Sequence, residues 1–536
     1  MSRGSAAPDK GLKREAGAWG LLLASLGGVV GSGWLFGPLN AAKTAGPAAV
    51  FAWTIGGGAM LLLGFVYAEL TTAFPRAGAV IALPKLSHGR LLATAMSWVV
   101  LLGYLTAAPA EATAVVTYAN NYAPGLVGDA GRLTAEGFGA ALVLLLAFAL
   151  LNLLAVRFVL RVNGAVTALK LAIPFLVLIA LPLGRFRPEN FSEAGFAPHG
   201  WAGVFSAVAT SGVIYAFTGF RQSIELAGES RNPRRDLPLA IIGSIGLAIV
   251  LYVGLQTVLI GALAPGELAH GWSGLNFPGL SGPFAGLATM MGMSWLAGLL
   301  YVDAAVSPAG VAIIAFASAP RLFFAAGREG LTRAPLTRLS RAGVPVVGVA
   351  LTFLVGALFL LPLPSWRAII RIVSAAALLS YGMASVTFLT LRRTMPLAVY
   401  PRPFQLAYGR SIASLAFVVA DFIIVGTGAR TMDVVLGYVV LAALIFALWQ
   451  TLRGARFEWM ELRGAVWLAP YYAGLCLLAN LGPQKLTGGY GLLSPLSLSL
   501  WLVLFSLLVL FVAVRCGSPD PQEAKTSIAA RHGPQA

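Results

Sequence analysis

Five of the ionisable side chains within or beside the long apolar stretches of this sequence are candidates for chemistry. Glu111, Lys170 and Asp303 are each flanked by small or apolar residues, whereas Glu69 and Arg221 lie closer to the ends of such stretches. An ionisable residue inside a membrane-spanning segment usually faces the protein interior and marks a path for charged solutes or protons. Two of the five are cations and three are carboxylates, so together they can bind a charged solute or carry a proton.

Two stretches near these residues are poorly suited to a continuous helix. Residues 21–39 read LLLASLGGVVGSGWLFGPL, and residues 211–220 read SGVIYAFTGF. Each glycine lowers helix propensity by roughly 1 kcal/mol relative to alanine. Because non-helical backbone at membrane depth must be buried in protein or line a cavity, both stretches predict interrupted helices. The alternative for the first stretch is that its glycines only allow close helix packing.

Interrupted helices expose backbone groups that match the two charges of an α-amino acid. The N–H groups that begin a half-helix attract a carboxylate, and we expect this at Gly33. Carbonyls freed at the end of the first half of the second stretch, around Ala216 and Phe217, can accept the ammonium protons. The candidate solute-binding residues are Gly31, Ser32, Gly33, Tyr215, Ala216, Phe217, Thr218, Gly219, Phe220 and Arg221.

Lys170 is a candidate for carrying a proton. It lies about nine residues, or roughly 13 Å along a helix, from Arg161, too deep for its amine to reach the membrane surface easily. A buried amine loses its proton more readily than an exposed one. Glu111 and Asp303 are further candidates for proton coupling, or they line the pocket. The alternative for Lys170 is a permanent charge that only ties its helix to carbonyls of the first apolar segment.

Arg221 has two possible partners. Its guanidinium can bind the side-chain carboxylate of an acidic solute bidentately. It can also pair with a carboxylate of the chain, and pairing is favoured because an unpaired buried guanidinium is costly. The candidate partners are Glu111, Glu225 and Asp303.

Glu69 and Trp34 are candidate gating residues. Glu69 lies five residues before Phe74-Pro75, near the predicted inner end of its segment, where it can serve as a gate or a packing residue. Trp34 lies within the first interrupted stretch, directly after Gly33. Aromatic side chains at such positions can cover a bound solute, although they are also common at helix interfaces.

Composition places the chain in a membrane. The sequence is 58% hydrophobic and 11% charged, with a mean hydropathy of +0.82, which lies outside the range of soluble proteins. The net charge of +17 does not indicate a nucleic-acid partner, because the basic residues are spread over short loops. Cys476 and Cys516 have no CxxC pattern and no nearby histidine. We therefore expect no metal, disulfide or cofactor.

Apolar segments and basic residues together predict the topology. We expect fourteen spans, at about 19–43, 48–73, 89–120, 136–156, 162–182, 203–226, 238–262, 286–320, 345–363, 368–391, 411–428, 432–451, 465–481 and 495–514. With the N-terminus inside, the inner side has 27 Lys and Arg residues and the outer side 8. Basic residues favour cytoplasmic loops, so both termini are expected in the cytoplasm of a multi-pass protein of the cell (inner) membrane. The outer basic residues are Lys43, Arg132, Arg185, Arg187, Arg367, Arg371, Arg430 and Lys485.

Spans one to five and six to ten form two sets that begin on opposite sides of the membrane. Each set begins with an interrupted helix, which is the sequence pattern of an inverted-repeat transporter with a midplane site. The last four spans carry no comparable set of residues. The expected organisation is an N-terminal tail 1–17, a transport core 18–392, spans eleven and twelve in 393–451, spans thirteen and fourteen in 452–514, and a C-terminal tail 515–536.

Several motifs in order resemble the amino acid–polyamine–organocation (APC) superfamily of permeases. They are GVVGSGWLFGP at 28–38, Tyr67-Ala-Glu-Leu70, Phe74-Pro-Arg-Ala-Gly78, Tyr215-Ala-Phe-Thr-Gly-Phe220, Asn232-Pro-Arg-Arg-Asp236 and RLFFAAGREGL at 321–331. Within the superfamily, Gly33–Pro38, Glu111 with Val115–Ala119, and Gly219–Gln222 are most similar to the bacterial aspartate:proton symporter type. The resemblance implies a five-plus-five inverted-repeat fold. It also implies that Lys170 stands where sodium-coupled relatives bind sodium.

These observations predict a secondary active transporter that imports an amino acid with protons. An acidic substrate such as aspartate or glutamate fits Arg221. The alternatives are an amino acid/amine exchanger and, on the same scaffold, a nutrient sensor. An integral membrane enzyme is not favoured, because the four histidines are scattered outside the expected spans. Membrane lipids are expected neighbours, and the oligomeric state is not indicated.

Overall fold

A computed structural model gives the fold of the chain. It describes residues 14–128, 131–154, 156–277, 282–328, 338–340, 343–361, 365–397, 400–452 and 459–517, together with 336 and 454. The expected tails 1–17 and 515–536 fall largely outside these residues, as does the end of the motif at 321–331. Among the described residues every named element is a helix. This follows from the apolar sequence, because a helix satisfies its own backbone hydrogen bonds in lipid.

The first part of the chain contains the first interruption. Helix α1 ends at Val29 and α2 begins at Ser32, so residues 30 and 31 separate two helical halves. A 3-10 turn, η1 (Gly46–Ala48), joins α2 to the next helix. The helices are α1 (Ala18–Val29), α2 (Ser32–Ala45), α3 (Ala49–Ala73), α4 (Ala79–His88), α5 (Arg90–Ala119), α6 (Ala135–Leu154) and α7 (Val156–Gly184).

The second part contains a bent pair. Helix α8 and the α9–α10 segment are inclined by 48° to one another at residues 211 and 212. The helices are α8 (Gly200–Thr210), α9 (Val213–Phe217), α10 (Arg221–Glu225), α11 (Pro233–Ala262), α12 (Pro283–Met290), α13 (Ser294–Arg328), α14 (Val346–Leu360) and α15 (Trp366–Thr394). Short 3-10 turns are η3 (Pro188–Phe191), η4 (Thr218–Phe220), η5 (Ala227–Glu229), η6 (Pro265–Leu268) and η7 (Trp272–Gly274).

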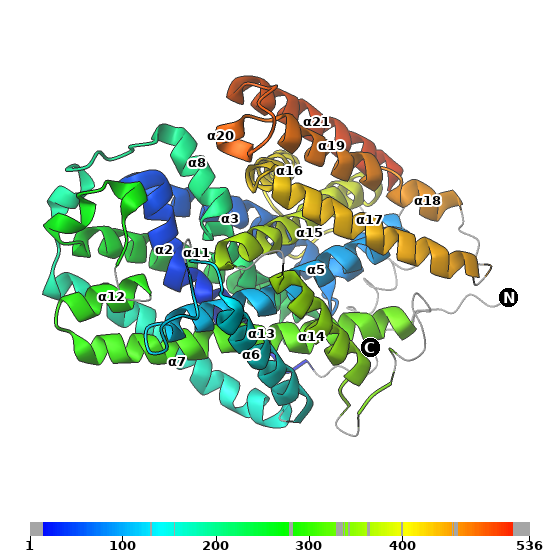
Figure 1. Ribbon diagram of the computed structural model, residues 1–536. Helices are drawn as coiled ribbons and strands as arrows, with labels where there is room; N and C mark the ends of the chain where they lie inside the picture. The colour runs from blue at the N-terminus through cyan, green and yellow to red at the C-terminus, as the bar shows by residue number, and fades with distance from the viewer. Residues whose placement is uncertain are drawn as a thin grey trace.

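The last part of the chain forms a separate group of helices. They are α16 (Gly409–Gly426), α17 (Ala429–Leu452), α18 (Trp459–Ala465), α19 (Leu468–Leu481), α20 (Gln484–Thr487) and α21 (Pro495–Cys516). The side chain of Ser494 caps the start of α21 by accepting a hydrogen bond from the Ser497 N–H. Figure 1 shows this group along one side of the molecule, where α16 packs on α15 and α3.

The number of spans differs from the expected fourteen. In the described residues, 11 helices are long and apolar enough to cross a membrane, or 12 when the bent pair counts as one span. The difference arises because α1 has only 12 residues, α14 has 15, and α2, η1 and α3 count as one run. The expected eighth span also differs, because α12 and α13 are separate helices.

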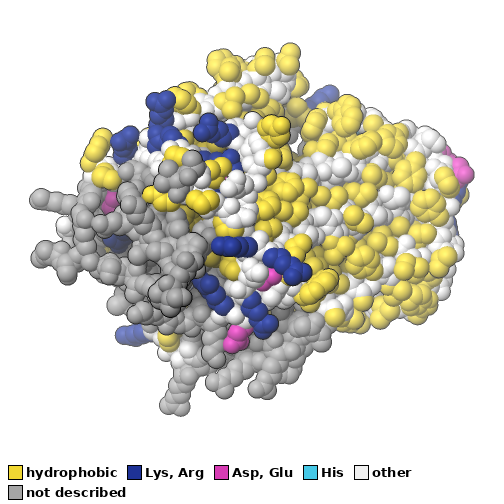
Figure 2. All heavy atoms as spheres, turned by 180° about the vertical axis from the view of Figure 1, so that it is seen from behind, with side chains coloured by type: hydrophobic (Ala, Val, Ile, Leu, Met, Phe, Trp, Pro, Cys, Tyr) yellow, Lys and Arg dark blue, Asp and Glu magenta, His cyan; other side chains and the backbone are white. Residues whose placement is uncertain are grey.

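Core helices pack in a pattern that brings distant segments together. Helix α3 lies against α11, α5 lies against both α13 and α15, and α13 also contacts α7. Helix α1 packs on α11 and on the turn η4, so the two interrupted regions are neighbours. Seen from behind, a broad hydrophobic surface covers much of the molecule, while Lys and Arg side chains gather toward one end (Figure 2). This distribution fits a membrane protein with basic loops.

Candidate functional site

The interruption between α1 and α2 is crowded, which explains its glycines. A Cβ atom added at Gly31 would lie 2.9 Å from Oε1 of Glu111, and one at Gly33 would lie 2.8 Å from the Ala216 Cβ. Other residues therefore cannot occupy these positions without displacing the neighbouring helix or carboxylate. The second half-helix begins at Ser32, one residue before the expected Gly33, with Gly31 as its N-cap.

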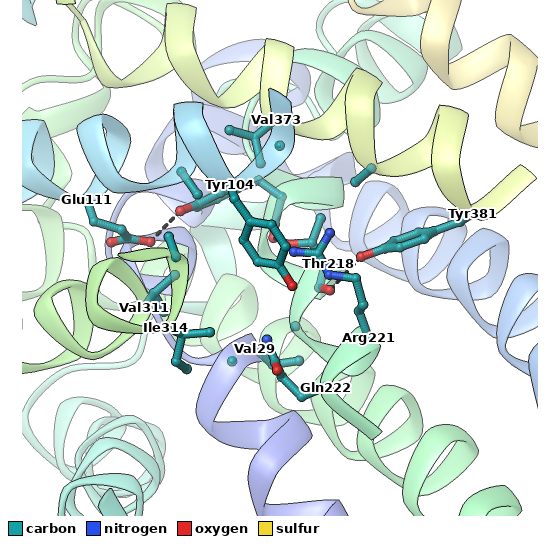
Figure 3. A pocket seen from close by; sticks show the side chains of 18 residues that line it. Val29, Tyr104, Glu111, Thr218, Arg221, Gln222, Val311, Ile314, Val373 and Tyr381 are labelled. Atoms are coloured by element: carbon teal, nitrogen blue, oxygen red, sulfur yellow. Dashed lines mark hydrogen bonds between the residues drawn. The ribbon is translucent and has the colours of Figure 1, made fainter. Parts of the chain in front are cut away.

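Glu111 from α5 occupies the backbone group that was expected to bind a carboxylate. Its side chain is fully buried, and its Oε2 accepts a hydrogen bond of 3.1 Å from the Ser32 N–H. The Tyr215 hydroxyl donates to Oε1 of the same carboxylate. A helix N-terminus attracts negative charge, and here the chain itself supplies it (Figure 3).

Lys170 from α7 contacts the end of α1 on the other side of the interruption. Its Nζ donates a hydrogen bond of 2.8 Å to the Gly27 carbonyl, and the residue is 2% exposed. A Cβ at Gly310 would lie 3.1 Å from that Nζ, so the amine also lies against α13. Lys170 thus joins three core helices at the depth of the interruption.

Asp303 and Trp34 lie among the same core helices. Asp303 is fully buried, and its Oδ1 accepts a hydrogen bond of 2.8 Å from Ser307, while its Oδ2 has no partner among the described residues. Trp34 is also fully buried and packs on Phe284, with 5.5 Å between ring centroids.

The second interruption differs from the expectation in position. The first half of this helix ends at Thr210, and not around Ala216 and Phe217, which lie at the end of the short helix α9. Gly212 supplies the bend through a left-handed backbone conformation with φ +93°, which residues other than glycine adopt rarely. A second distortion follows at Thr218–Phe220, where the helix tightens to a 3-10 turn that includes Gly219.

Side-chain hydroxyls donate hydrogen bonds to several carbonyls of this region. Tyr252 donates to the carbonyls of Val29 (2.9 Å) and Ala216 (3.2 Å), and so bridges both interruptions. Tyr381 donates to the Thr218 carbonyl at 2.8 Å, and Ser25 donates to that of Phe220 at 3.0 Å. Sequence reasoning missed both tyrosines. The available signal was that a tyrosine inside an apolar span needs a partner for its hydroxyl.

Arg221 begins α10 and stacks on an aromatic ring. Its guanidinium lies 4.0 Å from the centroid of the Tyr104 ring. The expected ion pair with a chain carboxylate is not present among the described residues, because no Asp or Glu oxygen lies within ion-pair distance of Arg221 there. Its Nε is buried without a hydrogen-bond partner in this part of the chain. The guanidinium is thus held by a cation–π contact that leaves hydrogen-bonding capacity free.

A narrow cavity connects these groups. Its volume is about 50 Å³, which suffices for a few water molecules. Glu111 lies at one end and Arg221 with Tyr381 at the other, with Tyr104 between them (Figure 3). The cavity is also lined by backbone of both interruptions, at Gly31 and Gly219. A negative and a positive side chain therefore face one small space at the centre of the fold.

Trp366 closes this centre from the predicted outer end. It begins α15, and its Nε1 donates a hydrogen bond of 2.8 Å to the Ser32 hydroxyl. Its ring packs on Phe36, with 5.1 Å between centroids, and against the edge of Tyr215. Sequence reasoning missed Trp366, because nothing in the sequence relates it to a residue more than 300 positions earlier.

Glu69 lies away from the centre and is fixed by cations. Arg392 donates to both of its oxygens, at 3.0 and 2.5 Å, and Arg402 donates at 2.5 Å. The Leu406 N–H adds a fourth hydrogen bond of 2.8 Å. The carboxylate thus ties the end of α3 to the end of α15 and to the loop before α16, at the predicted inner end.

Metal binding has no supporting geometry in the described ranges. No group of three or more His, Cys, Asp or Glu residues is placed there to hold a metal ion. Cys476 instead donates to Asp433 in the last group of helices.

Comparison with known proteins places the chain in a family. A family model described as Amino acid permease matches residues 17–449. The chain is 36% identical over 490 residues to the Glutamate/serine transporter AimA of Bacillus subtilis (strain 168), covering 89% of each chain. It is 34% identical over 504 residues to the Aspartate-proton symporter of the same organism, covering 93% of this chain and 96% of that protein. The Branched-chain amino acid permease BcaP of B. subtilis is 27% identical over 455 residues.

These matches cover most of the chain, including both interruptions and the residues around them. They agree with the apolar helices and with the resemblance in the sequence motifs. The chain therefore belongs to the amino acid permease family of the APC superfamily and is a multi-pass amino acid transporter of the cell membrane.

Proposed function

We propose that this transporter imports an acidic amino acid, such as aspartate or glutamate, by proton symport. The observation that carries the proposal is the contact between Glu111 and the Ser32 N–H. A backbone group suited to a substrate carboxylate is occupied by a carboxylate that can bind a proton. Relatives named as a glutamate/serine transporter and an aspartate-proton symporter support the same substrate class and coupling ion.

Competition between two carboxylates couples the proton to the substrate. When Glu111 is protonated it loses its negative charge and yields the Ser32 N–H to the substrate α-carboxylate, which the helix N-terminus prefers. The ammonium takes carbonyls near Ala216 and Thr218 from the hydroxyls that hold them now. Arg221 binds the side-chain carboxylate through its free Nε and the remaining guanidinium donors.

Lys170 links the proton to the movement of α1. While protonated, it donates to the Gly27 carbonyl and holds α1 against α7 and α13. Loss of this proton to the cytoplasm removes the charge that favours the contact, and α1 is then free to move. Asp303 lies among the same helices and is a second acceptor for the proton. Trp34 covers the bound solute as a gate, and the ion pairs of Glu69 with Arg392 and Arg402 hold the predicted inner gate closed.

An inverted repeat gives this movement its two sides. The packing supports such a repeat. Helices α5 and α13 are the third members of the two sets, and α7 and α15 are the fifth members. The third member of each set contacts the fifth member of the other set, as α5 contacts α15 and α13 contacts α7. Helices α1–α2 and α8–α10 then hold equivalent places as the interrupted first members of two five-helix sets. Both termini lie in the cytoplasm in this topology.

Uptake by purified protein in proteoliposomes tests the coupling. We expect labelled aspartate to accumulate under a pH gradient that is acidic outside, and a sodium gradient at equal pH to have no effect. Lys170→Gln should abolish this accumulation. Lys170→Arg should also fail, because a guanidinium does not release its proton in this pH range.

Lys85→Gln is the matched control, since Lys85 lies on α4 outside the membrane-spanning helices. It should accumulate aspartate as the unmodified chain does. Sodium-driven accumulation by the unmodified chain, or undiminished proton-driven accumulation by Lys170→Gln, would contradict the mechanism.

A further inference from the structure

A second cavity lies at the predicted outer end of the molecule. Its volume is about 300 Å³. Its walls come from the ends of α2 and α8, the start of α15, the connection between α16 and α17, and the short helix α20. The cavity therefore lies between the transport core and the last helices of the chain, for which the sequence indicated no role.

The charged side chains that line this cavity all have the same sign. They are Arg367, Arg371, Arg430 and Lys485, and no Asp or Glu is among the lining residues described. These four cations are half of the outer basic residues expected from the sequence. In the described part of the chain none of the four makes an ion pair or donates a side-chain hydrogen bond. The Nε atoms of Arg367 and Arg371 are buried without a partner there.

Such an arrangement is unfavourable without a ligand. Arg367 and Arg371 are one helical turn apart on α15, where like charges repel. Both are partly buried, so water solvates them incompletely. Arg187, also at the outer end, contrasts with them, because Glu189 and Glu193 lie 3.9 Å from its guanidinium. An anion in the cavity would supply the missing negative charge.

The cavity is next to the entrance of the central site. Arg367 follows Trp366, whose ring covers the start of α2. Thr44, on the opposite wall, is hydrogen-bonded at 3.1 Å to Ser211 at the second interruption. A displacement of the start of α15 would therefore move Arg367 and Arg371, and would at the same time remove Trp366 from the central site.

We propose that this cavity is an outer binding site for an acidic amino acid, which is captured there before it passes Trp366 to the central site. Arg367 and Arg371 bind one carboxylate, and Arg430 with Lys485 attracts the other. That the ligand is an acidic amino acid rests on the proposed function. The presence of a carboxylate-binding site at this position is independent of that function. Helices α19 to α21 then have a role, because the segment between α19 and α21 supplies Lys485 and completes the wall.

Concentration dependence of uptake tests the capture role. In the double variant Arg367→Gln/Arg371→Gln we expect the KM for aspartate to rise roughly tenfold, since a focused positive field raises the local concentration of an anion. Uptake of serine, which carries no net charge, should change little. At about 0.5 M salt the difference between variant and unmodified chain should shrink, because salt screens charges beyond a few ångströms.

Arg187→Gln is the matched control. It removes the same charge at the same end of the molecule, but outside the cavity, and should leave the KM for aspartate unchanged. Equal losses for aspartate and serine in the double variant would overturn the proposal in favour of a structural role for the arginines. An unchanged KM for aspartate would overturn it as well.

Direct binding separates this site from the central one. In Gly33→Leu the new side chain collides with Ala216, since even a Cβ at this position would lie 2.8 Å from the Ala216 Cβ, and it therefore displaces the backbone of the central site. Equilibrium dialysis with labelled aspartate should still detect weak binding to this variant, and adding Arg371→Gln should remove it. Loss of all binding in Gly33→Leu alone would overturn the outer site. If no amino acid is taken up by the unmodified chain, the proposed function fails, while the dialysis result still decides the outer site.

A lipid headgroup is the competing anion. Uptake is therefore compared in vesicles of phosphatidylcholine alone and with added phosphatidylglycerol. We expect the double variant to raise the KM for aspartate in both kinds of vesicle. An effect that appears only with phosphatidylglycerol would assign the cavity to a lipid phosphate and overturn capture of the amino acid.

Discussion

Glu69 and Glu111 are both fully buried glutamates on core helices, yet they are held by different kinds of partner. Glu69 receives hydrogen bonds from two guanidinium groups and one backbone N–H. Glu111 receives them from a tyrosine hydroxyl and one backbone N–H, all of which are neutral. The charge of the Glu69 carboxylate is balanced by two ion pairs. The Glu111 carboxylate has no cation in direct contact among the described residues.

This difference separates a fixed contact from an adjustable one. A carboxylate between two arginines keeps its charge, because protonation would leave both cations unpaired. A carboxylate held by neutral donors can accept a proton and keep part of its hydrogen bonding. We therefore assign Glu69 to the stability of the inner end and Glu111 to coupling at the centre.

Removing Glu69 should have the largest effect. In Glu69→Ala, Arg392 and Arg402 remain buried without their carboxylate, which costs about 3–5 kcal/mol. We expect a matching fall in the free energy of unfolding, measured by chemical denaturation in detergent. Glu189→Ala is the control, because its contact with Arg187 is long and exposed and contributes little. Equal losses in the two variants would remove the distinction between Glu69 and an ordinary surface carboxylate.

The buried arginines differ in the same way as the two glutamates. Arg392 and Arg402 have a carboxylate, whereas Arg221 stacks on Tyr104 and makes no ion pair among the described residues. In Arg221→Gln we expect aspartate to bind more weakly by about 1.5–3 kcal/mol, the contribution of a charged hydrogen bond. Binding of a neutral amino acid that the unmodified chain also takes up should be little affected. Competition uptake assays measure both. A similar loss for both substrates would show that the contact with Tyr104 is structural.

Glu111→Gln should have the smallest effect on binding and act on coupling. The amide can still accept hydrogen bonds from Ser32 and Tyr215, so the fold is retained, but it cannot carry the proton. We expect the accumulation ratio for aspartate to fall on the order of tenfold and uptake to lose its dependence on external pH. Glu189→Gln, which changes an exposed carboxylate in a long contact with Arg187, is the control and should keep that dependence. If uptake by Glu111→Gln still depends on external pH, the coupling proton is carried by another group.

Much of the central site was predictable because its parts are local in the sequence. Glycines in 27–33 predict a helix that cannot continue, and α1 does end at Val29. A lysine deep in an apolar segment predicts a buried partner, and Lys170 contacts the Gly27 carbonyl. The second interruption lies within the expected stretch 211–220, but the first half-helix ends before Gly212 and not around Ala216 and Phe217 as expected.

Partners from distant helices were not predictable in the same way. An ion pair of Arg221 with a chain carboxylate is not present among the described residues, where its guanidinium stacks on Tyr104 from α5. Trp366 and Tyr252 reach the interruptions from α15 and α11, and neither lies near a motif. Such contacts depend on the rotation of each helix about its axis, which apolar residues all around a helix leave undetermined.

The sequence by itself determined the membrane setting, the positions of most helices, the family motifs and the ionisable residues that must face the interior. Those properties depend on residue type and on the cost of exposing charge or backbone to lipid. Only the tertiary structure decided which buried charges meet. Helix packing set Glu69 between two arginines, placed Glu111 on the Ser32 N–H, and gathered four outer cations around one cavity. Contacts between residues hundreds of positions apart arise from how helices pack, and no local pattern records them.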